Sequence, residues 1–166
     1  TNGYRKYLNA EDFADYFLLN TLTRNGDGLL ISMFPWKGDD GKLRMGPVWD
    51  YNWASYHVGG GATGNLRWRS NQIWCPRLFA DPDFFQLYID RWFAFRRGAM
   101  SNANMDAIIN AQGAEITGAK AMLNGIASAA EFTNQLNAMK TWLRQRGDWV
   151  DSQYIRPPVF SVAGGI

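Results

Sequence analysis

Asp27 and Asp50 are the acidic residues whose surroundings indicate chemistry, and they lie 23 residues apart. Asp27 stands in the turn-forming run Asn25-Gly26-Asp27-Gly28, and Asp50 follows the run Gly46-Pro47-Val48-Trp49. Phosphoryl transfer uses such a pair, because one carboxylate orients or deprotonates the attacking hydroxyl and a second holds Mg²⁺ on the phosphate oxygens. Turn chemistry alone also accounts for Asp27, and a strand end with solvated polar residues accounts for Asp50.

Asn52 offers a further oxygen ligand beside Asp50. Residues two apart on an extended chain point to the same side, so Asp50 and Asn52 are expected to reach one cation or phosphate together. Tyr51 and Trp53 would then face the other way. Hard oxygen ligands favour Mg or Ca over zinc.

Other motifs support chemistry less well. An EF-hand beginning at Thr23 would need a bidentate Glu where the chain has Phe34, so this calcium loop is not expected. His57 is the only histidine, and no nearby residue would orient it toward a nucleophile. Cys75 is the only cysteine, which excludes a disulfide within the chain and favours a small core residue.

The elements that would position Asp27 and Asp50 are a helix and a hairpin. Asn9 is a good N-cap for a helix from Ala10 to about Arg24. The run from Leu29 to Trp36 predicts a buried strand, and Leu43 to Val48 predicts the return strand. This arrangement would place both aspartates on neighbouring parts of one small sheet.

A mainly α-helical bundle is predicted to follow, which makes the fold class α+β. Asp81-Pro82 is a strong helix start, and Ser128 is expected to begin the last helix. Four helices are predicted, over Ser70–Phe79, from Asp81 to about Arg97, from Ser101 or Asn102 to about Ile126, and from Ser128 to the stop at Arg156-Pro157-Pro158. Glycines weaken the third of these helices, and residues 57–70 are predicted to form a loop.

Composition and charge limit the classes of partner. The 166 residues suit one domain or a large piece of one, and eight tryptophans predict a core rich in ring packing. A net charge of +2 with scattered basic residues does not favour nucleic acid. There is no apolar run near the length of a membrane span.

The order of several motifs resembles the spore-coat CotH kinase family over about residues 9–160. The matching runs are Phe13-Ala14-Asp15-Tyr16-Phe17-Leu18-Leu19-Asn20, Asn25-Gly26-Asp27-Gly28, Gly46-Pro47-Val48-Trp49-Asp50-Tyr51-Asn52, Trp74-Cys75-Pro76-Arg77-Leu78-Phe79-Ala80-Asp81-Pro82-Asp83-Phe84, Trp142-Leu143-Arg144-Gln145-Arg146 and Pro157-Pro158-Val159-Phe160-Ser161.

The resemblance implies an atypical protein-kinase-like fold that uses ATP and Mg (or Mn) to phosphorylate Ser or Thr of coat or secreted proteins. It implies an extracellular, cell-surface or spore-surface location. Asp27 matches the catalytic-loop carboxylate, and Asp50 matches the metal ligand of a Trp-Asp-x-Asp pattern. Two positions depart from the family: Asn52 replaces the second Asp, and Ser32 stands where an Asn is usual.

A kinase also needs a strand Lys and a loop that covers the phosphates, and nothing before Asn9 supplies them. We therefore expect residues 1–158 to be the C-terminal portion of a CotH kinase-like domain, inactive alone, and residues 159–166 to begin a linker or following module. A second hypothesis is a catalytically inactive module that binds a surface protein or glycan. A third is a structural calcium site, formed by Asp27, Asp39, Asp40 and Asp50.

Overall fold

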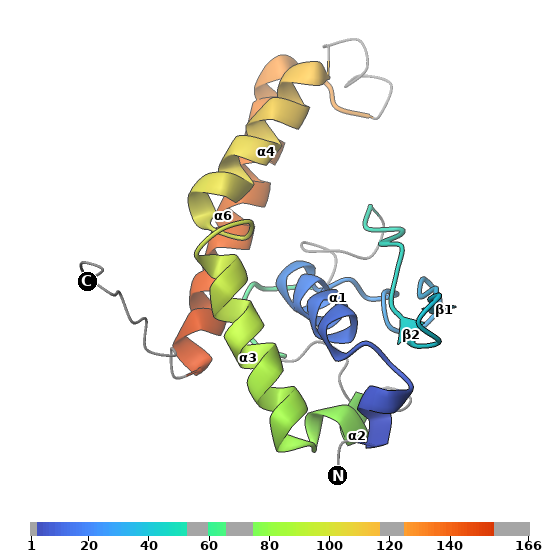
Figure 1. Ribbon diagram of the computed structural model, residues 1–166. Coiled ribbons are helices and arrows are strands. Elements are labelled where there is room, and N and C mark those ends of the chain that lie inside the picture. Colours follow the sequence, from blue (N-terminus) through green and yellow to red (C-terminus); the bar gives the residue numbers. More distant parts are fainter. Residues whose placement is uncertain (1–2, 53–59, 66–74, 117–124, 155–166) are drawn as a thin grey trace, which may run out of the picture.

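The computed structural model describes residues 3–52, 60–65, 75–116 and 125–154. A helical body carries one small hairpin, so the predicted α+β class is confirmed (Figure 1). In chain order the elements are η1 (Gly3–Lys6), α1 (Ala10–Thr23), β1 (Trp36–Lys37), β2 (Leu43–Arg44), α2 (Cys75–Phe79), α3 (Pro82–Arg96), α4 (Asn102–Glu115) and α6 (Ala129–Gln153).

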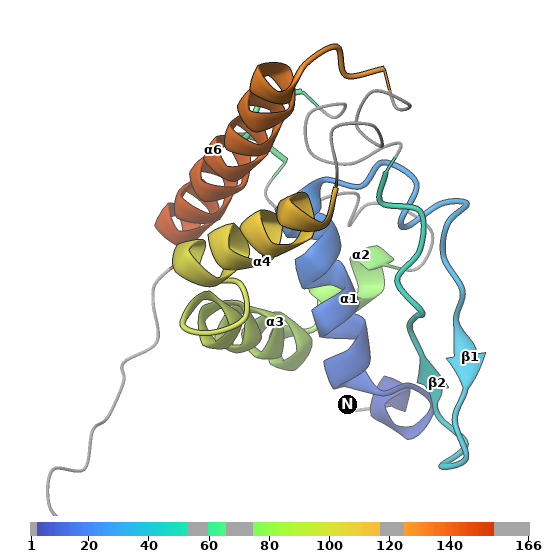
Figure 2. The same cartoon turned by 90° about the horizontal axis from the view of Figure 1, so that it is seen from above.

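Helix α1 is the central element, and it forms where the sequence predicts it. The Asn9 side chain accepts a hydrogen bond from the Asp12 amide at 3.0 Å, which caps the first turn. The helix ends because Arg24 takes a left-handed conformation with φ of 54°. Helix α1 lies between the hairpin and α3, and its apolar side chains fill the core (Figure 1 and Figure 2).

The hairpin is shorter than the sequence predicts, and the prediction of a buried strand from Leu29 to Trp36 is wrong. The amides of Leu30, Ile31 and Ser32 all donate to the Asp27 carbonyl, so this run winds into a turn. Leu30 and Ile31 are 50% and 71% exposed, whereas a buried strand would hide them. The ladder pairs Trp36 with Arg44 and Lys37 with Leu43 in antiparallel register, so the return strand also stops well before Val48.

The hairpin is fixed to the start of α1 through its second strand. The Leu43 amide donates to the Tyr7 carbonyl at 2.7 Å, and the Asn9 amide donates to the Leu43 carbonyl at 2.9 Å. Leu8 and Leu43 form an isolated parallel bridge. The chain that leads from β2 toward Asp50 therefore starts from a point anchored on α1.

Helix α3 packs against α1, and α2 packs against α3. The Asp81 carboxylate caps α3 by accepting from the amides of Asp83 and Phe84, both at 3.0 Å, as its sequence predicts. Phe17, Phe79, Phe84 and Tyr88 meet edge to face in the core. The predicted helix over 70–79 is confirmed from Cys75 onward, and its first half lies outside the described residues.

Helices α4 and α6 lie against each other and extend away from this core (Figure 1). Ser101 and Ser128 cap them as predicted, each accepting from an amide three residues on. Helix α4 ends at Glu115 rather than continuing toward Ile126, and residues 117–124 lie outside the described part. Helix α6 ends at Gln153, before the proline pair, which also lies outside.

No helix among the described residues is long and apolar enough to cross a membrane.

Candidate functional site

Asp27 stands at the start of a tightly bonded turn. The Asn25 side-chain oxygen accepts from the amides of Asp27 and Gly28 at 3.0 and 3.1 Å. The Asp27 carbonyl then accepts from three amides, those of residues 30, 31 and 32, at 2.9, 3.1 and 3.0 Å. Asp27 as a residue is half-buried, and both its amide and its carbonyl are hydrogen-bonded.

Asp50 lies in an irregular segment rather than at a strand end. Its φ of 61° is left-handed, a conformation that Asp adopts more readily than most residues, and residues 51 and 52 form a turn. The chain is therefore not extended here, and the inference that alternation would place Asp50 and Asn52 on one side is wrong. Asn52 is exposed in that turn, and Asp50 is half-buried.

Two side chains join the Asp27 turn to the Asp50 segment. The Ser32 hydroxyl donates to the Asp50 carboxylate at 3.1 Å, and the Asn25 side-chain nitrogen donates to the Asp50 carbonyl at 3.3 Å. Ser32 and Asn25 are 4% and 0% exposed, and both bonds are part-buried because Asp50 itself is half-buried. The structure thus brings the two predicted loops together through loop contacts, not through neighbouring strands as expected.

Asn25 also belongs to the site, and the sequence does not predict that it bonds to the Asp50 segment. Its position two residues before Asp27 indicates an Asx turn, and the structure contains that turn. Asn25 and Asp50 are 25 residues apart, so no local sequence pattern predicts the hydrogen bond between them.

The oxygen donors described around Asp50 are fewer than the six to eight that calcium takes. They comprise the Asp50 carboxylate, the Ser32 hydroxyl and the nearby Asp27 turn. Magnesium is commonly held by one or two carboxylates together with substrate phosphates and waters, whereas calcium takes six to eight oxygens. The described residues contain no group of three or more His, Cys, Asp or Glu that could hold a metal. The four aspartates of the calcium hypothesis, Asp27, Asp39, Asp40 and Asp50, therefore do not form one ligand group.

The structure describes the environment of Cys75, the only cysteine of the chain. Cys75 is 1% exposed in the core, as predicted, and burial raises the pKa of its thiol to about 11. A thiol with that pKa is a poor nucleophile at neutral pH. His57 lies outside the described residues.

The loop that follows the Asp50 segment is described over residues 60–65. It has no regular structure, in agreement with the sequence, but its carbonyls are bonded to side chains of three other positions. Arg146 donates to the carbonyls of residues 62, 64 and 65, Arg24 donates to that of Gly61, and Trp142 donates to that of Gly60 at 3.1 Å.

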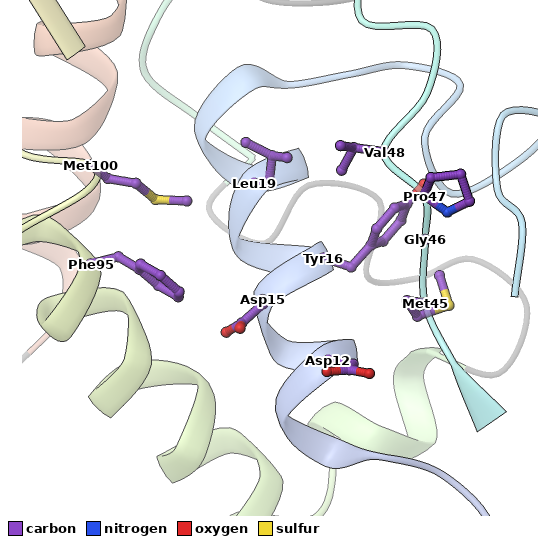
Figure 3. Close-up of a pocket in the computed structure, with 10 residues that line it drawn as sticks. All are labelled: Asp12, Asp15, Tyr16, Leu19, Met45, Gly46, Pro47, Val48, Phe95 and Met100. Carbon is purple, nitrogen blue, oxygen red and sulfur yellow. The ribbon is translucent and has the colours of Figure 1, made fainter. Parts of the chain in front are cut away.

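A pocket of about 340 Å³ opens beside the site, between α1, the segment 45–48 and the end of α3 (Figure 3). Asp12 and Asp15 line it, but both carboxylates are already paired. Asp12 accepts from Arg44 at 2.8 Å, and Arg91 holds both oxygens of Asp15. Because both carboxylates are held in ion pairs, neither is free for acid–base chemistry in this pocket.

The comparisons with known proteins give one match. The sequence model of a family described as CotH kinase protein matches residues 1–150, which is most of the chain. No curated protein and no solved structure matches it. The match includes both loops of the site and confirms the resemblance drawn from the motifs. The chain belongs to the CotH kinase protein family.

Proposed function

We propose that this chain supplies the catalytic loop and the metal loop of an ATP-dependent protein kinase that phosphorylates Ser or Thr hydroxyls of coat or secreted proteins. The observation that carries the proposal is the joining of the Asp27 turn to the Asp50 segment by Asn25 and Ser32. Family membership supports the same reaction class.

In this proposal Asp27 acts on the substrate hydroxyl. The hydroxyl oxygen forms a bond to the γ-phosphorus of ATP, the bond from that phosphorus to the β–γ bridging oxygen breaks, and ADP leaves. Asp27 orients the hydroxyl and accepts its proton. Backbone bonding of the turn favours this role, because a base must be held at a fixed distance from the reacting oxygen.

Asp50 is the proposed metal ligand, with Asn52 and Ser32 as neutral oxygens within the same loops. A bound Mg²⁺ would neutralise charge on the phosphate oxygens during transfer. Ser32 donates to one Asp50 oxygen, which leaves the other oxygen of that carboxylate for a cation.

The test is transfer of labelled phosphate from ATP by the protein in its full natural length. We expect Asp27→Asn and Asp50→Asn each to lower the rate by about 100-fold or more. Asp39→Asn is the matched control, because it removes the same charge from the exposed tip of the hairpin. Undiminished transfer by Asp50→Asn would contradict the metal assignment.

A second candidate function is a catalytically inactive binding module, and exposed rings support it. Phe34, Pro47 and Trp49 line an apolar hollow of about 320 Å³, and the two aromatic side chains are 49% and 58% exposed. Aromatic surface of this kind suits a protein or glycan partner. Calorimetry with Mg-ATP separates the candidates, since an inactive module should give no heat of binding while the kinase should.

A further inference from the structure

Tyr16 of α1 contacts the Asp27 turn at two points. Its hydroxyl oxygen lies 2.5 Å from the Gly28 carbonyl and 3.1 Å from the Ser32 carbonyl, and the residue is 4% exposed. Burial raises the pKa of Tyr16, so the hydroxyl keeps its proton and is the donor to these carbonyls. Gly28 directly follows Asp27, and Ser32 is the last of the three residues whose amides bond to the Asp27 carbonyl. One hydroxyl on a rigid helix therefore holds both ends of the turn that carries Asp27.

Asn20, one turn further along α1, fits against the same loop. Its side-chain nitrogen donates to the Tyr16 carbonyl at 2.8 Å, and its side chain is fully buried. A Cβ at Gly28 would lie 1.9 Å from the Asn20 side-chain oxygen, so only glycine allows this approach. The loop and the helix are thus in direct contact beside the Tyr16 hydroxyl.

The same face of α1 also meets the Asp50 segment. The Tyr16 ring points from α1 toward Gly46 and Pro47, which lead to Asp50 (Figure 3). The Ser32 carbonyl accepts a hydrogen bond from Tyr16, and the Ser32 hydroxyl donates one to the Asp50 carboxylate. Tyr16 therefore lies between the two loops of the site and contacts the residue that joins them.

We propose that Tyr16 is a positioning residue, whose hydroxyl fixes the Asp27 turn and, through Ser32, the Asp50 carboxylate. The role in turnover rests on the proposed kinase function, while the role in holding the turn does not. Tyr16 makes no contact with a reacting group in this assignment. It acts through the backbone of the turn, so its removal should lower kcat and leave the KM for the protein substrate nearly unchanged.

Tyr16→Phe is the test variant, because it removes one oxygen and keeps the buried ring. Tyr88→Phe is the matched control: the Tyr88 hydroxyl is also buried, and it bonds to the Thr21 hydroxyl at 2.8 Å, away from the turn. The first measurement is amide hydrogen exchange of residues 30–32 in this chain. We expect Tyr16→Phe to speed exchange there by about fivefold or more, and Tyr88→Phe to leave it unchanged.

The second measurement is steady-state phosphoryl transfer by the full-length protein. We expect kcat to fall by about tenfold in Tyr16→Phe and to stay near the wild-type value in Tyr88→Phe. Unchanged exchange at residues 30–32 would overturn the proposal whatever the activity. Faster exchange with unchanged kcat would overturn the catalytic part alone. A wild-type protein that transfers no phosphate would refute the proposed kinase function, and the exchange result would still decide whether Tyr16 holds the turn.

Discussion

Asn52 presents a carboxamide where the resemblance to the family implies a second carboxylate. The turn at 51–52 leaves Asn52 exposed, two residues beyond the half-buried Asp50. An amide oxygen is a weaker ligand for a hard divalent cation than a carboxylate, because it carries no net charge. The present site should therefore bind metal weakly by its own residues and depend on nucleotide phosphates for the rest.

Asn52→Asp should consequently tighten divalent metal binding. We expect the affinity for Mn²⁺ to rise by about tenfold, equivalent to about 1.4 kcal/mol. Isothermal titration with MnCl₂ would measure it. Asn137→Asp, on the exposed face of α6, adds the same charge far along the chain and serves as the control. Equal affinities for the two variants would argue that residue 52 is not a ligand.

Cys75 gives a residue-scale prediction that does not depend on function. Its pKa is about 11 in the folded chain against 9.0 for an ordinary thiol, because burial disfavours the thiolate. The folded state then holds the thiol proton where the unfolded state releases it. This contribution to the free energy of unfolding is complete below pH 9 and is lost as the pH rises through 11.

Two measurements check the Cys75 prediction. A disulfide reagent at pH 8 should react with the thiol only after denaturant is added. Between pH 9 and 11, the free energy of unfolding should fall less steeply in Cys75→Ala than in the wild type. Rapid labelling of the native chain would show that the thiol is accessible after all.

At the scale of elements, Arg146 joins three parts of the chain that are distant in sequence. Its buried guanidinium donates to the Thr21 carbonyl of α1 at 2.8 Å and to three carbonyls of the loop 60–65. The described contacts give it no carboxylate partner, and burial lowers its pKa to about 10. The arginine therefore stabilises chiefly by donating to the buried carbonyls of Thr21 and Ala62.

Arg146→Met should lower the free energy of unfolding by about 3 kcal/mol, because it leaves the two buried carbonyls of Thr21 and Ala62 without this donor. Arg144→Met is the control, since Arg144 lies on the exposed side of α6 and pairs with Asp106 at the surface, where an ion pair contributes about 0–1 kcal/mol. Urea denaturation would measure both variants. Similar losses in the two would mean that the buried bonds contribute little.

The helices could be predicted from sequence because their starts are local. Asn9, Asp81 and Ser128 each cap a helix with their own side chain, three residues from the amide that they accept. The apolar run from Leu29 predicts a buried strand, and the structure contradicts this prediction. Leu30 and Ile31 are exposed instead, since the Asp27 carbonyl draws their amides into a turn.

The site could be predicted only in part, for a related reason. Asp27 and Asp50 carry signals in their own neighbourhoods, namely a turn run and a motif. The hydrogen bonds that join their loops connect Ser32 and Asn25 with Asp50, which lies 18 and 25 residues further along the chain. No local pattern specifies such pairs, because each depends on how the hairpin packs against α1.

For the whole molecule, the two loops and α1 form one bonded unit, so a cation held at Asp50 should stabilise the fold. Binding to the native state alone contributes about 2.7 kcal/mol when the ligand is at 100 times its dissociation constant. For a chain of this size that corresponds to a rise in Tm of about 5–10 °C. Thermal melts with MnCl₂ and with chelator should differ by this amount in the wild type.

The same melts test whether the stabilising cation binds where the proposed function requires. Asp50→Asn should abolish the Mn²⁺-dependent rise in Tm, while Asp39→Asn should retain it, because Asp39 stands at the exposed hairpin tip. CaCl₂ should give a smaller rise than MnCl₂, since the loops offer too few oxygens to fill a calcium coordination shell. A Mn²⁺ effect that persists in Asp50→Asn would place the cation elsewhere in the molecule and remove the metal role from this segment.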